Sequence, residues 1–359
     1  MDSARPTLLG IATASPGPPV AQAHFKELLT ELWIGSDAGL RATLDVFETS
    51  GVRTRHFALP LEAYAGLETF AQRNAKYVER ARALNAEAAL EALRRAGRTV
   101  DDVTHVVVVS TTGLATPSLD ALLLNDIGLP GHVRRVPVWG LGCAGGAAAL
   151  GLAADLARTD SDAVVLAVVV ELCSLAFVPG ERTKLNLVAS ALFGDGVAAF
   201  VVGGEGTGLE LGSHRTTTWP HTLGIMGWDV NDQGLGLVLS RNLPNFARDR
   251  MGAVLSDLRA HAGWGPTDAP AFAAIHPGGP KVLDALSDSL GLSPALFDPA
   301  RRVMARYGNM SAPTCLFVLA DILRETPEPA GPGVYSALGP GFTCDMGVLS
   351  PVPVAARRR

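Results

Sequence analysis

The sequence predicts a layered α/β fold built from two copies of one half, and two observations support this. Continuous valine-rich runs at 104–111 and 163–171 are typical of strands that are buried on both faces. They alternate with stretches such as 83–95, which is rich in alanine and leucine, has its charges on one side and is typical of a helix. The second observation is a repeat along the chain.

A repeat is visible as three pairs of similar residues in which the same number of positions separates the two members. The pairs are Gly97 and Gly263, Gly113 and Gly279, and Asp155 and Asp321. The first pair follows a predicted helix, the second follows a predicted strand, and the third lies in an apolar helix. Because the period is too long for a solenoid, it indicates duplication of a half-domain. We place the halves at residues 1–205 and 206–359, with the joint in the glycine-rich segment 202–208.

Composition excludes several classes of protein. With 48% hydrophobic and 18% charged residues among 359, the chain can bury a large core and is not disordered. The net charge of −5 argues against a nucleic-acid partner, which would need a basic face. Val136–Ala154 carries no charge and is nearly long enough to cross a bilayer. However, Pro137 and five glycines in it indicate close packing in a soluble protein, so we expect no membrane insertion.

The cysteines and histidines do not form a metal motif. Four cysteines are widely spaced without a CxxC pair, and no histidines follow the HExxH or i, i+4 pattern. We therefore expect neither a metal site nor a bound cofactor. The start of the chain does not resemble a secretory signal, which predicts a cytoplasmic protein with free thiols. The Arg357–Arg359 tail is expected to be solvated.

Cys143 is the candidate nucleophile. It lies in Gly142-Cys-Ala-Gly-Gly146, between a short predicted strand and a predicted helix at 144–158. A helix N-terminus stabilises a thiolate, so we expect this thiol to ionise more easily than usual. The neighbouring glycines would admit a substrate, and the following N–H groups would stabilise an oxyanion. Taken alone, Cys143 fits a buried structural cysteine better, but its place in the repeat favours the functional interpretation.

The spacing of the repeat also maps Cys143 onto Asn309, which precedes a predicted helix at 310–324. Two helix N-termini would then face one centre. His276 lies at the end of a predicted strand and before a glycine turn, in Ile275-His-Pro-Gly-Gly-Pro280. A cysteine protease also uses Cys, His and Asn. In a different chemistry, His and Asn donate hydrogen bonds to the enolate that forms when a malonyl thioester loses carbon dioxide, and the enolate attacks an acyl group on the cysteine.

A rival interpretation comes from Gly140-x-Gly142-x-x-Gly145, which matches the dinucleotide fingerprint after a strand and before a helix. Glu171, at the end of the next strand, would then bind the ribose of NAD(P). Two features argue against the interpretation that the chain is an NAD(P)-binding oxidoreductase. The motif lies far from the N-terminus, and a cysteine occupies the position that would face the pyrophosphate.

Five segments together resemble the type III polyketide synthases, the chalcone-synthase-like family, over nearly the whole chain. They are Gly142–Gly146, Leu192-Phe-Gly-Asp-Gly196, Ile275–Pro280, Tyr307-Gly-Asn-Met-Ser311 and Gly339-Pro-Gly-Phe342. The resemblance implies a thiolase-like fold of duplicated αβαβα layers and a homodimer. It also implies an acyltransferase that uses coenzyme A thioesters.

The resemblance also implies roles for individual residues. Cys143 would carry the starter and the growing chain, while His276 and Asn309 would orient the malonyl thioester and stabilise its enolate. Phe193 would be the gatekeeper between the coenzyme A tunnel and the cavity. Gly339, Pro340, Gly341 and Phe342 would shape the cavity in which the product cyclises.

Departures from the plant enzymes bear on the substrate. Leu237 replaces their second gatekeeper phenylalanine, Ala176 replaces a threonine, and Thr116 replaces a methionine that reaches across the dimer. These residues predict an aliphatic pocket suited to a long acyl chain. Trp228, in Met226-Gly-Trp-Asp-Val230, resembles the bacterial branch that makes alkylresorcinols and alkylpyrones and would line the pocket. Cys173 instead resembles the tetrahydroxynaphthalene synthases.

The phosphates of coenzyme A require basic residues at the entrance. Arg53, Arg55 and Lys281 are the candidates. The sequence thus predicts an enzyme that extends a fatty acyl-CoA with malonyl-CoA or methylmalonyl-CoA units and closes the product to a resorcinol or pyrone. The alternative within the family is a tetrahydroxynaphthalene synthase that uses malonyl-CoA alone.

Overall fold

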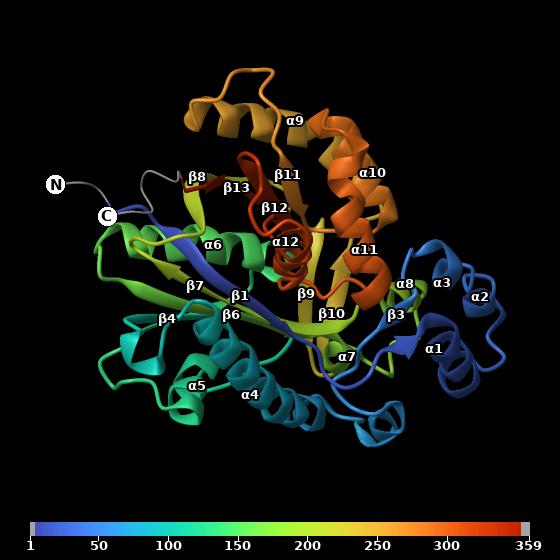
Figure 1. The fold of residues 1–359 in the computed structure, drawn as a ribbon. Helices are drawn as coiled ribbons and strands as arrows, with labels where there is room; N and C mark the ends of the chain where they lie inside the picture. The colour runs from blue at the N-terminus through green and yellow to red at the C-terminus, as the bar shows by residue number, and fades with distance from the viewer. Residues whose placement is uncertain (1–3, 353–359) are drawn as a thin grey trace.

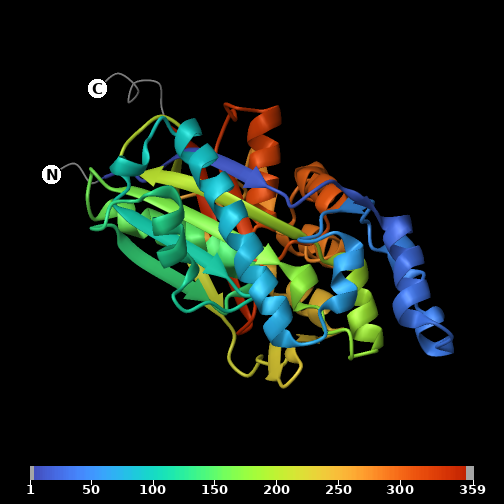
Figure 2. The same ribbon diagram turned by 90° about the horizontal axis from the view of Figure 1, so that it is seen from below.

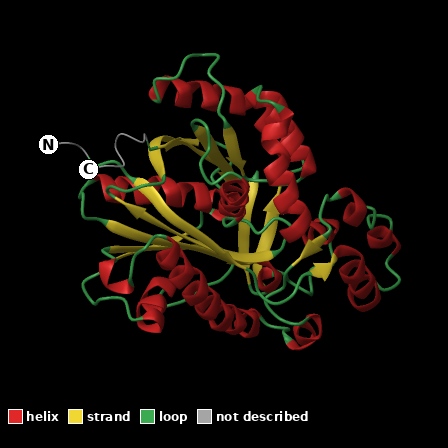
Figure 3. Cartoon of the chain, viewed as in Figure 1, coloured by secondary structure: helices red, strands yellow, loops and turns green. Residues whose placement is uncertain are grey.

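The computed structural model describes residues 4–352 and has a layered α/β fold. Figure 1 shows α6 and α12 between two groups of strands, with α4 and α5 on one outer side and α9 and α10 on the other. Figure 3 shows the same arrangement as strands covered by helices on both faces. These layers are those of the thiolase-like fold, as expected.

The first half supplies five strands of the main sheet. In spatial order they are β5 (Arg134–Trp139), β4 (His105–Ser110), β6 (Val164–Leu172), β7 (Asp195–Gly203) and β1 (Thr7–Ala14). β4 pairs in parallel with both β5 and β6, whereas β7 is antiparallel to β6 and β1. Every residue of β4, β6 and β7 is buried, which explains their continuous apolar sequences.

The second half supplies four strands, in the order β8 (Leu209–Thr218), β13 (Thr343–Pro351), β12 (Gly333–Gly339) and β11 (Phe272–Ile275). β1 and β8 join the two half-sheets through only two residue pairs, Thr7–Glu210 and Leu8–Leu209. Two further pairs of strands stand apart from this sheet: β9 (Met226–Asn231) with β10 (Gly234–Leu239), and β2 (Val20–Ala21) with β3 (Thr54–Arg55).

Helices cover and separate the half-sheets. The long helix α4 runs along the outer face of the first half-sheet, as Figure 2 shows from below. The helices are α1 (Gln22–Leu29), α2 (Ala38–Arg41), α3 (Val46–Thr49), α4 (Phe70–Arg95), α5 (Leu119–Ile127), α6 (Gly145–Arg158), α7 (Cys173–Ala176), α8 (Lys184–Leu192), α9 (Leu243–His261), α10 (Pro280–Leu290), α11 (Asp298–Tyr307) and α12 (Thr314–Glu325).

The repeated positions occupy matching places. Gly97 and Gly263 follow α4 and α9 with φ values of 64° and 69°, a left-handed conformation that favours glycine. Asp155 and Asp321 lie in α6 and α12, which pack against each other. The division at residue 205 stays a prediction; β7 ends at Gly203 and β8 begins at Leu209.

Two predicted helices have different bounds in the structure. α4 begins at Phe70, well before the predicted start at 83, because Thr69 and Gln72 form a capping box there. α12 begins at Thr314 instead of 310, since Ser311 has a left-handed φ of 58° that interrupts the helix. Val136–Ala154 comprises the end of β5, a turn and most of α6, and none of the helices within 4–352 has the length and apolarity for a membrane span.

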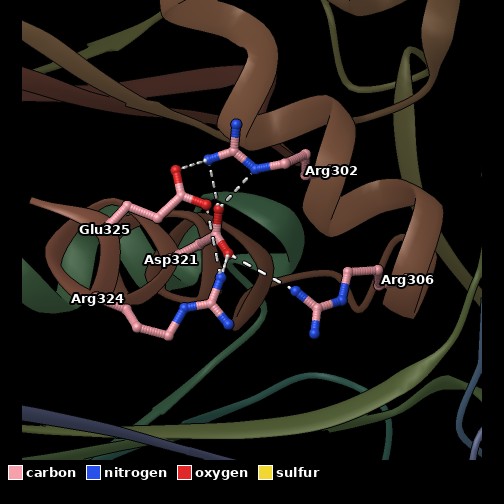
Figure 4. Close-up of polar contacts among 5 residues, drawn as sticks. All are labelled: Arg302, Arg306, Asp321, Arg324 and Glu325. Atoms are coloured by element: carbon pink, nitrogen blue, oxygen red, sulfur yellow. Dashed lines mark hydrogen bonds and ion pairs between the residues drawn. The ribbon is translucent and has the colours of Figure 1, made fainter.

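A cluster of ion pairs fastens α11 to α12 (Figure 4). The buried Asp321 carboxylate accepts hydrogen bonds from Arg302 of α11, at 2.8 and 3.1 Å, and from Arg324, at 2.5 Å. Arg306 lies 3.9 Å away, and Glu325 accepts a further bond from Arg302. Because α11 runs directly into Tyr307-Gly-Asn309, this cluster supports the segment that carries the predicted catalytic Asn309.

Replacing Asp321 with alanine should lower the free energy of unfolding by about 1–3 kcal/mol, because three arginines lose a shared acceptor. Thermal or urea unfolding of the purified protein measures the change. The matched control is Asp155→Ala at the equivalent position of the first half. Asp155 is 56% exposed, against 7% for Asp321, so its loss should cost less than about 1 kcal/mol. Equal losses for the two variants would contradict the role of the cluster.

Candidate active site

The two halves enclose a largely apolar cavity of about 510 Å³. Cys143 reaches it from the start of α6, His276 from the end of β11, and Asn309 from the loop between α11 and α12. The structure therefore brings the three predicted catalytic residues to one space, although they come from three separate segments of the chain. Within residues 4–352, no group of His, Cys, Asp and Glu side chains could hold a metal ion.

Cys143 lies in a short 3₁₀ helix, Gly142–Ala144, that leads into α6. Two glycines allow this turn to pack closely. Gly142 has a left-handed φ of 48°, and a Cβ atom there would lie 2.7 Å from Pro340. A Cβ atom on Gly146 would lie 2.2 Å from the carbonyl oxygen of Ala312. The start of α6 is thus pressed against the segment that follows Asn309.

The His276 imidazole lines the cavity without a protein partner. Its backbone N–H donates to Ser336 of the neighbouring strand β12, which fixes the residue at the strand end. The side chain is 4% exposed, yet neither Nδ1 nor Nε2 makes a hydrogen bond. Buried polar atoms normally have partners, so this ring is placed to meet a substrate group.

The Asn309 side chain is held in one orientation. Its Oδ1 accepts the backbone N–H of Ser311 at 2.8 Å, and its Nδ2 donates to the carbonyl of Gly278 at 3.3 Å. An amide NH₂ has two hydrogens, so one donor is left for a ligand. Gly278 belongs to the turn after His276, which links the two predicted enolate-binding residues directly.

Burial dominates the protonation of this site. It raises the pKa of the Cys143 thiol to about 11, although hydrogen bonding with Ser311 opposes the shift. It also lowers the pKa of His276 to about 3. The expectation that Cys143 ionises easily is therefore wrong for this buried site, because loss of water costs the thiolate more than its hydrogen bonds return. Both shifts favour the neutral forms, a thiol and an imidazole.

Ser311 is a contact of Cys143 that sequence reasoning did not single out. Its hydroxyl lies 3.5 Å from the Cys143 Sγ atom, and it also lines the cavity. In the sequence it stands out only as the end of the Tyr307–Ser311 segment. Its left-handed φ of 58° turns the chain back toward Cys143, a feature that the sequence pattern does not reveal.

Glu171 does not serve the ribose-binding role of the rival interpretation. Its carboxylate is fully buried and accepts hydrogen bonds from Thr111 N–H, Thr112 N–H and the Thr112 hydroxyl, at 2.7–2.9 Å. Burial raises its pKa to about 7. The acid thus fixes the loop after β4 and is not available to a dinucleotide.

Six of the predicted pocket residues line the cavity, and four do not. Those that line it are Phe193, Trp228, Leu237, Cys173, Ala176 and Pro340. Phe342 instead packs in the core against Trp219 and Phe246, and Gly339 and Gly341 flank Pro340 without lining the cavity. Thr116 lies in a separate pocket of about 950 Å³ between α5 and β5.

The three predicted coenzyme A residues differ in position. Arg53 and Lys281 have exposed side chains outside the cavity lining. Arg55 is 1% exposed, and its guanidinium bonds to backbone carbonyls of α8 and to Gln22. This position disfavours the prediction that Arg55 binds coenzyme A, because its Nη1 and Nη2 donors are used inside the protein and its unpartnered Nε is also buried.

Comparison with known proteins agrees with this geometry. Residues 2–206 match the N-terminal domain of chalcone and stilbene synthases, and residues 210–353 match the C-terminal domain. A solved structure of 1,3,6,8-tetrahydroxynaphthalene synthase from Streptomyces coelicolor A3(2), a bacterial type III polyketide synthase, superposes with a TM-score of 0.91 at 31% identity. The match covers 97% of this chain and all of that one.

Two curated relatives extend the comparison. A 1,3,6,8-tetrahydroxynaphthalene synthase from Streptomyces peucetius subsp. caesius is 41% identical over 96% of this chain and 92% of its own length. A putative chalcone synthase from Bacillus subtilis strain 168 is 33% identical over 96% of this chain and 98% of its own. The chain therefore belongs to the chalcone and stilbene synthase family and is an enzyme of the type III polyketide synthase class.

Proposed function

We propose that this polyketide synthase loads an aliphatic acyl-CoA onto Cys143, extends it with malonyl-CoA and closes the product to a resorcinol or pyrone. The observation that carries the proposal is the cavity itself, in which an unpartnered imidazole, an oriented amide and a thiol meet within an apolar lining. Thiol and imidazole supply acyl transfer, and imidazole and amide supply the hydrogen bonds for an enolate.

Loading begins with the neutral pair. Cys143 Sγ attacks the starter carbonyl while its proton passes to His276, a C–S bond forms, and coenzyme A leaves and takes that proton. A malonyl thioester then loses carbon dioxide, and the electron pair of the broken C–C bond forms an enolate. His276 and the free Asn309 N–H stabilise the enolate oxygen. The enolate carbon attacks the acyl group, a C–C bond forms, and the Cys143 C–S bond breaks, which leaves a Cys143 thiolate that can attack the thioester of the extended chain.

The lining supports an aliphatic starter. Leucines and aromatic rings on β9 and β10 and on α1 dominate the wall, including Trp228, Leu235, Leu237 and Phe25. Among the described lining residues, Arg55 and Glu62 are the formally charged ones, and the guanidinium of Arg55 is occupied by carbonyl groups. The wall thus provides apolar contacts for an alkyl chain, but its described residues include no free cation that would bind the carboxylate of a charged starter.

A second candidate is synthesis of tetrahydroxynaphthalene from malonyl-CoA alone. The relative at 41% identity carries that name, and so does the structure at TM-score 0.91. Cys173 lines the cavity, where the sequence resembles these enzymes. The two candidates differ in whether malonyl-CoA also supplies the starter. We infer in both cases a homodimer that uses coenzyme A thioesters in the cytoplasm, with Arg53 and Lys281 as candidates for contact with coenzyme A.

Product analysis decides between the candidates. We expect incubation with malonyl-CoA and a series of acyl-CoA starters to give alkylated resorcinols or pyrones whose masses follow the starter, measured by mass spectrometry. The same incubation without a starter tests the second candidate. Tetrahydroxynaphthalene in the starter-free sample, with no starter-dependent product, would replace the first proposal by the second.

Replacing Cys143 with alanine should abolish acyl loading, because Cys143 is the residue that forms the thioester in the proposed mechanism. Intact-protein mass spectrometry should show no acyl adduct, and product formation should fall by more than about 10³-fold. Decarboxylation of malonyl-CoA to acetyl-CoA should continue, since His276 and Asn309 remain. An acyl adduct that persists in this variant would place the nucleophile elsewhere.

The rate at which iodoacetamide alkylates Cys143 should rise by about tenfold per pH unit between pH 6 and 9. The reason is the pKa near 11, which leaves only a small thiolate fraction that grows with pH throughout this range. Peptide mass spectrometry follows the reaction at Cys143, and the Cys143→Ala variant gives the background from other thiols. A rate that stays constant over this range would instead indicate a preformed thiolate–imidazolium pair.

A further inference from the structure

Arg55 is a fully buried charge at the border of the cavity. Its Nη1 donates to the carbonyls of Ser190 and Phe193, the latter at 2.6 Å. Its Nη2 donates to the carbonyl of Ala191 at 2.7 Å and to the Oε1 of Gln22. The side chain thus binds three carbonyl groups from the end of α8 and the residue that follows.

These carbonyls are the ones that a helix leaves without intrahelical partners. The last carbonyls of α8 need donors from elsewhere, and a cation at this end also offsets the partial negative charge of the helix. Arg55 serves three of them, and the fourth, that of Leu192, accepts the backbone N–H of Asn309 at 2.8 Å. The end of α8 is therefore shared between Arg55 and a proposed catalytic residue.

The segment around Arg55 also holds the end of α11. The backbone N–H of Arg53 donates to Ala305 at 2.8 Å, and the Thr54 hydroxyl donates to the carbonyl of Arg306 at 2.7 Å. Residues 53–55 thus bond to the C-terminal ends of both α8 and α11. The residues that follow these two ends are Phe193 and the Gly308–Asn309 pair.

The two helix ends are also bonded directly. Gly194 N–H donates to the carbonyl of Asn309 at 2.9 Å, which pairs Phe193 with Asn309 as a bridge. A Cβ atom on Gly194 would lie 2.2 Å from the Tyr307 carbonyl oxygen, so the two segments are in close contact. A shift of α8 relative to α11 would therefore move Phe193 and Asn309 with respect to His276.

Arg55 keeps its charge in this setting. Burial lowers the pKa of its guanidinium to about 9, while the nearby Asp195 carboxylate opposes the shift. Gln22, itself buried, accepts from Arg55 and donates through Nε2 to the Ala191 carbonyl at 2.9 Å. The fork of the guanidinium suits several fixed acceptors, whereas a lysine ammonium at this position could not reach all of them.

We propose that Arg55 is a positioning residue for the decarboxylation half of the reaction: it fixes the end of α8 against α11 and so places Asn309 and Phe193 for malonyl thioester. The proposal rests on the proposed role of Asn309 as an enolate donor. It predicts that loosening this junction impairs enolate formation more than acyl transfer to Cys143, which lies on a different segment.

The test compares two half-reactions in the full-length enzyme. Acetyl-CoA formation from malonyl-CoA measures decarboxylation, and the acyl adduct on Cys143 after mixing with an acyl-CoA measures loading. In Arg55→Lys, kcat for decarboxylation should fall by about 10-fold or more, as expected for a misplaced catalytic group, with KM within about 2-fold. The loading rate per folded molecule should change by less than about 3-fold.

Thr54→Val gives a milder change that keeps the fold, because it removes one hydrogen bond at the end of α11. It should lower decarboxylation by about 2- to 5-fold without affecting loading, and it decides the question if Arg55→Lys does not fold. Arg98→Lys, an exchange at an exposed arginine after α4, is the matched control and should leave both rates unchanged. Asn309→Ala should lower decarboxylation as well.

The outcomes distinguish a failure of the positioning role of Arg55 from a failure of the proposed role of Asn309. If Asn309→Ala lowers decarboxylation but Arg55→Lys and Thr54→Val do not, the positioning role is overturned and the proposed function stands. If both half-reactions fall in parallel with the thermal midpoint, Arg55 supports only the fold and the inference is likewise overturned. If Asn309→Ala decarboxylates at the wild-type rate, the enolate role of Asn309 fails and the inference fails with it.

Discussion

The active site depends on a junction where the ends of α8 and α11 meet through backbone hydrogen bonds. Leu192 accepts from Asn309, Asn309 accepts from Gly194, and Arg55 binds the remaining carbonyls of the α8 end. Backbone groups at helix ends must find partners wherever water is excluded. The same bonds that satisfy these groups therefore also fix where the amide of Asn309 lies.

Burial affects the protonation of Cys143 and His276, which line the same cavity as Asn309. Burial raises the pKa of the Cys143 thiol and lowers that of the His276 imidazole, and both shifts favour the neutral forms. A neutral imidazole carries one donor and one acceptor, so it can take a proton from the thiol or donate to a carbonyl oxygen. In the proposed mechanism, His276 therefore contributes both to loading and to enolate formation without a permanent ion pair in an apolar space.

Much of this arrangement could be predicted from the sequence, since it rests on local patterns. Valine runs indicated the buried strands, the constant spacing of the repeat paired α4 with α9 and α6 with α12, and glycine-rich turns marked Cys143 and His276. Two kinds of feature could not be predicted. The pKa of Cys143 depends on how completely the folded protein covers it, and Arg55 changes from an expected surface ligand to a buried donor because carbonyls distant in sequence converge on it.

The hairpin of β9 and β10 has a consequence for how such enzymes diversify. It forms its own two-stranded sheet outside the nine-stranded sheet, and Trp228, Leu235 and Leu237 on it form part of the cavity wall. Mutations there can change the shape of the space in which a chain folds back on itself, while other segments hold the reactive centre. New products can therefore evolve through mutations in this hairpin while the fold of the enzyme is retained.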